Sequence, residues 1–430
     1  MESDGICEMS LLVFFDIKKD QYSPYIYLSF IVICLAFIPP LAFLISIFLL
    51  FIYGFSGSCR KDLLLVFIFG ASASTVISGV GQANFLTFSD DYITYYNNYL
   101  TLLNGDYSIG LTRFSKGFEP GVPIVHLLFS FIINEPSPYI VKAFHMVFQI
   151  SLFSLCIIKI ANFYKLKVNE IFIFAGLMLL FYKSVTIFFL LRQGYASIFI
   201  VLSLFSIGKT QKKIYWLIAI LFHVSSLIIL PFISFVLFNK RSRNVWLASI
   251  GMFVFSGVVF IYINYLTGFN SGIPLLNKFN HIIQLVNAEQ TLLIAIKKNL
   301  TAIIFLVPLI LLWVLGGVMR IKVNRIQPVL LFFVFIISTI YIPGFMLRVL
   351  MPIHALLTGY LYFTLFQFYN NLKYSVIVYS IFTLVVCGNW VITSTSYYER
   401  YPMFSVFPFY YIDSLFVEIP YKLERKWEKI

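Results

Sequence analysis

Charge is the scarcest property of this chain. Only 11% of its 430 residues are Asp, Glu, Lys or Arg, whereas 60% are hydrophobic and the mean hydropathy is +0.91. Soluble domains carry about 25% charged residues. A water-soluble core cannot use this much apolar side chain, so the composition indicates that much of the chain lies in a second apolar solvent, the lipid bilayer.

Clusters of metal-ligating or disulfide-forming side chains are also missing. The five cysteines form no CxxC pair, and three of them fall inside apolar runs. The five histidines are scattered without metal-ligand spacing, and there is no Gly-rich loop of the kind that cradles phosphates. The sequence therefore predicts no disulfide framework, no metal site and no cofactor.

The few charges are mostly positive, and the formal net charge is +13. In a soluble protein this excess would raise the question of nucleic acid. Here the Lys and Arg residues gather in short loops between apolar runs, as they do in cytoplasmic loops of membrane proteins. We therefore expect membrane lipids, and no nucleic acid, around this chain.

These basic loops give the predicted orientation. The loops that should face the cytoplasm contain Arg60 and Lys61, Lys165 and Lys167, residues 209–213, 240–243 and 320–325, and Lys373. The same rule places two long polar segments, 81–119 and 267–299, on the outer, periplasmic side, together with the tail 396–430. We expect one integral membrane domain over residues 1–430.

Apolar runs predict an all-α, polytopic transmembrane fold with about 11–13 spans, some of them broken or re-entrant. The single runs cover residues 25–53, 63–80, 139–160, 171–191, 195–207, 245–266, 300–319 and 375–395. Two further runs, 214–238 and 329–368, begin and end at basic loops, so they must turn back near residues 223–226 and 343–348. Half-length helices are expected in the first of these hairpins, because broken helices are tolerated where they line a protein cavity.

A tyrosine-rich segment lies within the first predicted outer segment, 81–119. If it is helical, its tyrosines share one face at i, i+3, i+4 and i+7, and these residues are Tyr92, Tyr95, Tyr96 and Tyr99. Asp91 precedes them and is placed to cap the helix. The segment is either a capped interfacial helix with an aromatic belt or a sugar-binding surface on which the rings stack.

Two other candidates stand where polar sequence meets apolar runs. Glu119 precedes Pro120, so it either favours the start of a helix through the helix dipole or forms a carboxylate at a cavity mouth that acts as general base. His223 lies at the tip of the predicted hairpin 214–238 and is either a polar cap or a second candidate base.

Arginines on the predicted outer side suit a different task. Arg192, beside Gln193, lies between two apolar runs and either snorkels to the interface or binds a diphosphate through its planar, bidentate guanidinium. Arg348, at the tip of the second predicted hairpin, allows the same two interpretations. Arg113 adds positive charge to the first outer segment.

The order of these motifs resembles the EpsG-like branch of the Wzy O-antigen and exopolysaccharide polymerases, over roughly residues 25–415. The motifs are Asp91-Tyr92-x-x-Tyr95, Glu119-Pro120-Gly121, Arg192-Gln193-x-x-Ala196, His223-x-Ser225 and a tail rich in Tyr and Pro. Some of these proteins carry an Arg-x10-Gly pattern in outer loops. The pair Arg348 and Gly359 has that spacing, whereas Arg192 does not, because residue 203 is Ser.

The resemblance implies a multi-pass enzyme of the bacterial inner membrane, similar to GT-C glycosyltransferases. Such an enzyme joins oligosaccharide repeat units carried on undecaprenyl diphosphate at the periplasmic face during lipopolysaccharide biosynthesis, in some cases with a chain-length-determining membrane protein. The expected catalytic residues are Glu119, Arg192, Asp91 and His223, and the expected substrate-binding residues are Tyr92, Tyr95, Gln193, Arg348 and Arg113. Which of Glu119, Asp91 and His223 is the base stays open.

Two alternatives remain on the sequence alone. A lipid-linked oligosaccharide flippase or another transporter would also have about twelve spans, but repeated halves would favour it and none are visible. An O-antigen ligase would share the donor chemistry and would pass the glycan to a different acceptor.

Overall fold

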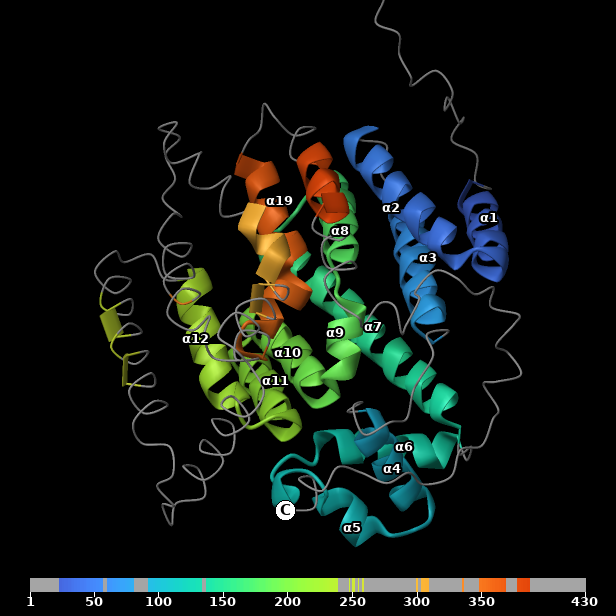
Figure 1. Ribbon diagram of the computed structural model, residues 1–430. Helices are drawn as coiled ribbons and strands as arrows, with labels where there is room; N and C mark the ends of the chain where they lie inside the picture. Colours follow the sequence, from blue (N-terminus) through green and yellow to red (C-terminus); the bar gives the residue numbers. More distant parts are fainter. Residues whose placement is uncertain are drawn as a thin grey trace, which may run out of the picture.

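Helices form every regular element in the part of the chain that the computed structural model describes (Figure 1). The described residues are 23–56, 60–80, 92–133, 137–238, 303–308, 348–368 and 377–386, with isolated positions at 247, 250, 251, 254, 257, 258, 299, 300 and 335. The all-α expectation is confirmed. Asp91, residues 267–298 of the second predicted outer segment and the tail 396–430 lie outside the described residues.

The first apolar run forms two helices where one span was expected. Helix α1 covers Ser23–Phe37 and α2 covers Pro39–Ser56. Pro39 and Pro40 cannot donate backbone hydrogen bonds and their rings crowd the preceding turn, so the run breaks at Ile38. Helix α3, Lys61–Val80, packs against both α1 and α2, and these three helices form one side of the molecule (Figure 1).

Three of the described helices are long and apolar enough to cross a membrane, namely α2, α3 and α7, Pro138–Phe163. Shorter apolar helices accompany them, including α1, α6, α8, α10 and α12. This confirms a helical membrane protein. The predicted number of spans includes segments outside the described residues and stays a prediction.

The described part of the first segment that was predicted to lie on the outer side is helical. Helix α4 covers Tyr92–Leu103, α5 covers Tyr107–Thr112, and a 3-10 turn follows at Ser115–Gly117. Helix α6, Gly121–Ile132, begins directly after Glu119 and Pro120, as the sequence predicted. Helices α4, α5 and α6 form one unit at the end of the molecule (the α4–α6 unit; Figure 1).

The predicted single span 171–191 is wrong, because the helix stops early. Helix α8 covers Val168–Leu180, a short α9 covers Ser184–Phe189, and α10 covers Leu191–Leu204. A Cβ on Gly194 would lie 2.1 Å from the carbonyl oxygen of Ile187, so only glycine allows α10 to start this close to α9. This junction places Arg192 and Gln193 in the first turn of α10.

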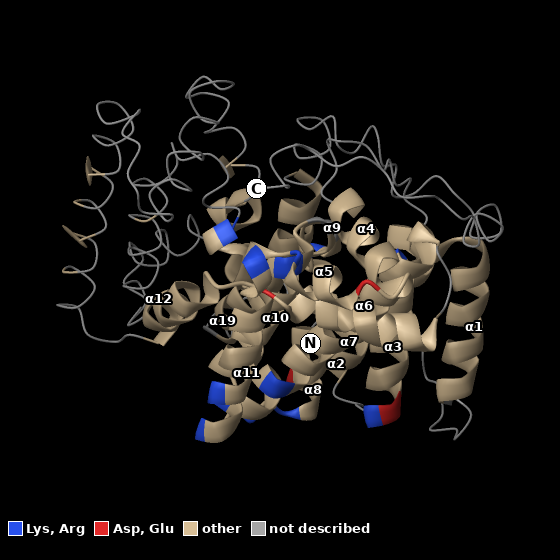
Figure 2. Ribbon diagram, turned by 90° about the horizontal axis from the view of Figure 1, so that it is seen from below, with Lys and Arg blue, Asp and Glu red and all other residues tan. Residues whose placement is uncertain are grey.

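A hairpin follows, as predicted. Helix α11 covers Lys209–Phe222 and α12 covers Ser226–Phe238, with the turn at residues 223–225. Helices α10 and α11 are joined by four residues and pack side by side, so the start of α10 lies beside the end of α11. The lysines at the start of α11 lie at the opposite end, where blue segments also mark the ends of α3 and α8 (Figure 2).

Of the last described helices, α19 packs against α8. A π-helical turn at Pro352–Leu357 runs into α19, Thr358–Phe368, a 3-10 turn covers Ile304–Leu306, and residues 377–386 are helical. A Cβ on Gly359 would lie 2.3 Å from the carbonyl oxygen of Leu177. Gly359 therefore lets the backbones of α19 and α8 approach closely, which is a packing reason for the glycine of the Arg-x10-Gly spacing.

Replacing Gly359 by Ala should separate these two helices. The new methyl group would meet backbone, which cannot rotate away, so we expect the free energy of unfolding to fall by about 1–3 kcal/mol. The measurement is the melting temperature of the purified variant in detergent. Gly251→Ala is the control, because a Cβ there meets no described atom within 4 Å; equal melting temperatures for the two variants would contradict the close packing.

Candidate functional site

The buried carboxylate of Glu119 joins three segments that are far apart in the sequence. Its side chain is 3% exposed, and its two oxygens have three partners. Oε2 lies 2.6 Å from Arg192 Nη1. Oε1 lies 2.6 Å from His223 Nδ1 and accepts the backbone N–H of Val224 at 3.1 Å. The structure therefore brings together three of the four predicted catalytic residues.

These partners keep Glu119 ionised. Burial by itself would raise the pKa of the carboxyl group, but the hydrogen bond and charge of His223, the charge of Arg192 and the N–H of Val224 together lower it to about 2. A carboxylate with this pKa is a weak proton acceptor near neutral pH. Glu119 is thus better suited to orient His223 than to act as the base itself.

An unusual turn delivers Glu119 to this position. Ser115, Lys116 and Gly117 all have left-handed backbone conformations, with φ of 49°, 55° and 89°. For the two non-glycine residues this conformation is sparsely populated and costs backbone energy, which is commonly found beside functional sites. The chain then leaves the turn through Phe118 and enters α6 two residues after Glu119.

His223 sits where α11 ends. Its backbone is extended, with φ −157° and ψ 116°, so the helix cannot continue through it. Its Nδ1 faces Glu119, while its Nε2 has no hydrogen-bond partner among the described residues, and the side chain is 24% exposed. The carboxylate therefore orients the imidazole through Nδ1 and leaves Nε2 without a hydrogen-bond partner among the described residues.

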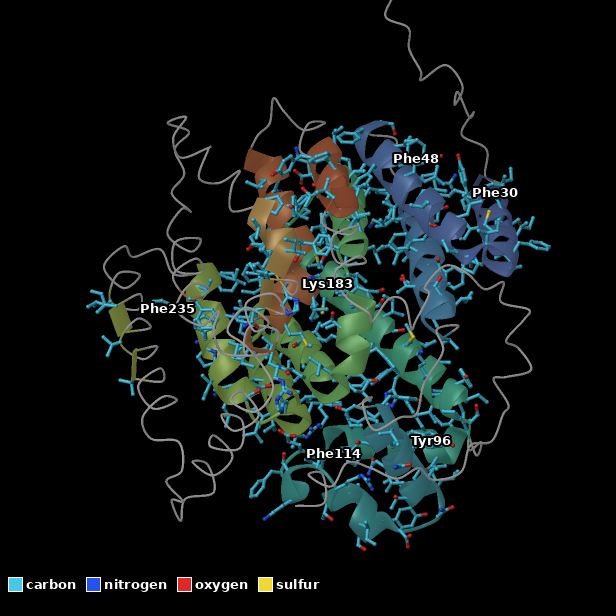
Figure 3. The ribbon with its side chains drawn as sticks, in the orientation of Figure 1. Phe30, Phe48, Tyr96, Phe114, Lys183 and Phe235 are labelled. Atoms are coloured by element: carbon cyan, nitrogen blue, oxygen red, sulfur yellow. The ribbon has the colours of Figure 1, made fainter. Side chains whose placement is uncertain are left out.

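Arg192 is held by more than its ion pair. The guanidinium carbon lies 4.8 Å from the ring centre of Phe114, a cation–π contact, and the guanidinium donates a further hydrogen bond to the side chain of Tyr95. Phe114 lies in the α4–α6 unit (Figure 3). The side chain of Arg192 remains 31% exposed, so it is not sealed in the interior.

Gln193 links the segment that contains Arg348 to the start of α10, beside Arg192. Its side-chain amide donates to the backbone carbonyl of Arg348, and the Arg348 side chain is exposed. Arg113 is half-buried at the end of α5, next to Phe114. The backbone of Arg348 is therefore tied to the first turn of α10, beside Arg192.

The tyrosines of α4 are packed inside the protein. The predicted helix is present, but Tyr92 and Tyr99 are each 1% exposed; Tyr92 donates to the carbonyl of Pro138 and Tyr99 to that of Ile133, the latter at 2.7 Å. Tyr95 is 5% exposed and packs against Phe114. These contacts account for the tyrosines by packing, and substrate binding by Tyr92 and Tyr95 stays a prediction.

Some participants were not identified from the sequence. Phe114 and the N–H of Val224 act through contacts that only the fold creates. Behind the site, a buried hydrogen-bonded group contains His126, His145 and Tyr195. The available signal was the presence of polar side chains inside apolar helices, where they are costly and therefore informative.

The chain matches the EpsG family over residues 63–411. Neither the curated proteins nor the solved structures give a match. The matched segment contains the described site and covers well over half of the 430 residues. This helical membrane protein therefore belongs to the EpsG family.

Proposed function

We propose that the protein is an O-antigen polymerase, a membrane glycosyltransferase that joins oligosaccharide repeat units carried on undecaprenyl diphosphate. The observation that carries this proposal is the buried Glu119 carboxylate, which orients His223 on one side and pairs with Arg192 on the other. This arrangement offers a positioned base next to a cation that suits a phosphate. Membership of the EpsG family supports a polymerase-like role in polysaccharide biosynthesis.

His223 is the proposed base. A hydroxyl at the non-reducing end of one lipid-linked unit attacks the anomeric carbon of the donor glycan and loses its proton to His223 Nε2. As the new glycosidic bond forms, the bond from the anomeric carbon to the diphosphate oxygen breaks. Glu119 accepts the Nδ1–H and stabilises the imidazolium that results, as the carboxylate of a catalytic triad does.

Arg192 is the proposed partner of the leaving group. Undecaprenyl diphosphate departs with negative charge on its terminal phosphate, and a fixed, planar guanidinium can donate two hydrogen bonds to it. The ion pair with Glu119 uses Nη1, and the side chain of Arg192 is 31% exposed. Arg348 is proposed to add positive charge here, since Gln193 anchors its backbone beside Arg192.

The proposed location is the periplasmic face of the bacterial inner membrane. The lysine-rich ends of α8 and α11 lie opposite the end of α11 that carries His223 (Figure 2). If those basic ends face the cytoplasm, the site faces the periplasm. The proposed partners are the lipid-linked oligosaccharides and a chain-length-determining membrane protein.

Deletion of the gene tests the reaction class. A strain without the polymerase should display lipopolysaccharide with a single repeat unit, because flipping and ligation still operate. The measurement is the lipopolysaccharide ladder on a gel, with the deletion complemented as the control. Loss of even the single unit would favour the flippase or ligase alternative, and an unchanged ladder would refute the polymerase.

Replacing Arg192 by Ala should collapse the ladder while the protein still inserts. The negative charge that develops on the leaving diphosphate would lose its cationic partner, so we expect the polymerisation rate to fall about a hundredfold or more. Arg60→Ala is a matched control, because Arg60 also pairs with a carboxylate, Asp62, but is exposed at the lysine-rich end. Full-length chains from the Arg192 variant, at equal protein level, would remove its proposed role.

Replacing Glu119 by Gln removes the negative charge of the side chain and keeps its shape. The amide keeps an oxygen that can accept from His223 but cannot balance the imidazolium, so we expect the rate to fall by about 10²-fold or more. The pKa of about 2 means that wild-type Glu119 is charged near neutral pH, so at that pH the substitution removes a full negative charge beside His223. Glu170→Gln is the control, since Glu170 also accepts a backbone N–H, from Lys167 at 2.8 Å. A normal rate in the Glu119 variant would show that the charge is dispensable.

A further inference from the structure

A row of hydrogen bonds runs through the interior behind the site. Asn98 Oδ1 lies 2.8 Å from His126 Nδ1, and His126 Nε2 lies 2.8 Å from His145 Nε2. His145 Nδ1 lies 2.9 Å from the hydroxyl of Tyr195. All four side chains are buried, and they come from four helices, α4, α6, α7 and α10. We call these four residues the buried histidine chain.

The proton positions in the buried histidine chain follow from the orientation of the Asn98 amide at one end. The Asn98 amide nitrogen donates to the carbonyl of Gly110 at 2.8 Å, so Asn98 Oδ1 must be the acceptor for His126. His126 then carries its proton on Nδ1, and its Nε2 accepts from His145 Nε2–H. The remaining His145 Nδ1 accepts from the Tyr195 hydroxyl. With both rings neutral, each of these hydrogen bonds has one donor and one acceptor, as buried polar groups require.

The two histidines are unsuited to sharing a metal ion. Two nitrogens bound to one tetrahedral zinc ion at about 2.0–2.1 Å each would be about 3.3 Å apart, whereas these atoms lie 2.8 Å apart. A continuous proton relay is also disfavoured, because the chain ends at an amide that neither gains nor loses a proton. The geometry is that of a rigid, directional hydrogen-bond network.

Tyr195 connects this chain to the site. It follows Arg192 by three residues on α10 and so lies near it along the helix. Its ring stacks on Phe222, with centroids 4.8 Å apart and planes at 25°, and Phe222 directly precedes His223. Phe222 also packs against Gly121 at the start of α6, where a Cβ would meet its ring at 2.7 Å.

We propose that His126, His145 and Tyr195 are positioning residues that hold Glu119, Arg192 and His223 in register. His126 anchors α6, which begins two residues after Glu119. Tyr195 anchors α10, which carries Arg192, and presses on Phe222 beside His223. The inference rests on the proposed function for its catalytic consequence, whereas the tautomers and contacts of the chain do not depend on it.

The proton arrangement is tested by nitrogen NMR on the full-length protein, labelled with ¹⁵N-histidine, in lipid nanodiscs. One buried ring should be protonated on Nδ1 and its partner on Nε2, with a ¹⁵N–¹⁵N coupling between them through the shared hydrogen bond. Two rings in the same tautomer, or a charged ring in the coupled pair near neutral pH, would overturn the chain as described.

The positioning role is tested with Tyr195→Phe, which keeps the ring on Phe222 and removes only the hydroxyl. The probe is the lipid-linked oligosaccharide extracted from the deletion strain, polymerised by purified protein in nanodiscs. We expect kcat to fall roughly tenfold or more, because small misplacement of reacting groups is costly, while KM changes less than about twofold. The signal of His145 Nδ1 should shift as it loses its donor.

Tyr362→Phe is the matched control. Tyr362 is equally buried and donates to the carbonyl of Phe305 at 3.1 Å, on α19. If both variants keep the wild-type kcat, or both lose only thermal stability, the positioning role is overturned. If wild-type protein makes no polymer from the probe while the NMR tautomers are as expected, the proposed function fails and the hydrogen-bond chain stands.

Discussion

The site depends on a charged carboxylate that is almost completely buried. A buried ion is tolerated only when its hydrogen bonds are complete, and removing one partner of a buried pair typically costs several kcal/mol. Glu119 meets this condition with Arg192, His223 and the N–H of Val224. These partners come from separate helices. The hydrogen bonds that this one carboxylate requires therefore fix the relative positions of α6, α10 and the α11–α12 turn.

Interrupted helices make this arrangement feasible. Glu119 precedes α6, Arg192 lies in the first turn of α10, and His223 follows the last residue of α11. An uninterrupted helix has no free backbone N–H to offer a carboxylate, whereas its ends do. The N–H of Val224 is such a group. Non-helical backbone at membrane depth is tolerated where protein surrounds it, and here it supplies the polar contacts of the site.

The sequence predicted those features that depend on local pattern. Apolar runs predicted the helices, Pro120 the start of α6, and the spacing of basic loops the turn at His223. It did not reveal which residue pairs with Glu119, because Arg192 and His223 are 73 and 104 residues away. The break between α8 and α9 was also missed, because Phe181 and Tyr182 continue the apolar run past the end of α8 and leave no signal for it.

The α11–α12 hairpin has a consequence for the surrounding lipid. Its helices contain 14 and 13 residues, so each is about 20 Å long, against about 30 Å for the hydrocarbon core. A bilayer beside these helices must either become thinner or leave the His223 turn beneath its surface. In both cases the headgroup of the proposed lipid-linked substrate and the turn come closer together along the membrane normal. Hydrophobic mismatch would then contribute to substrate approach without any residue touching the lipid carrier.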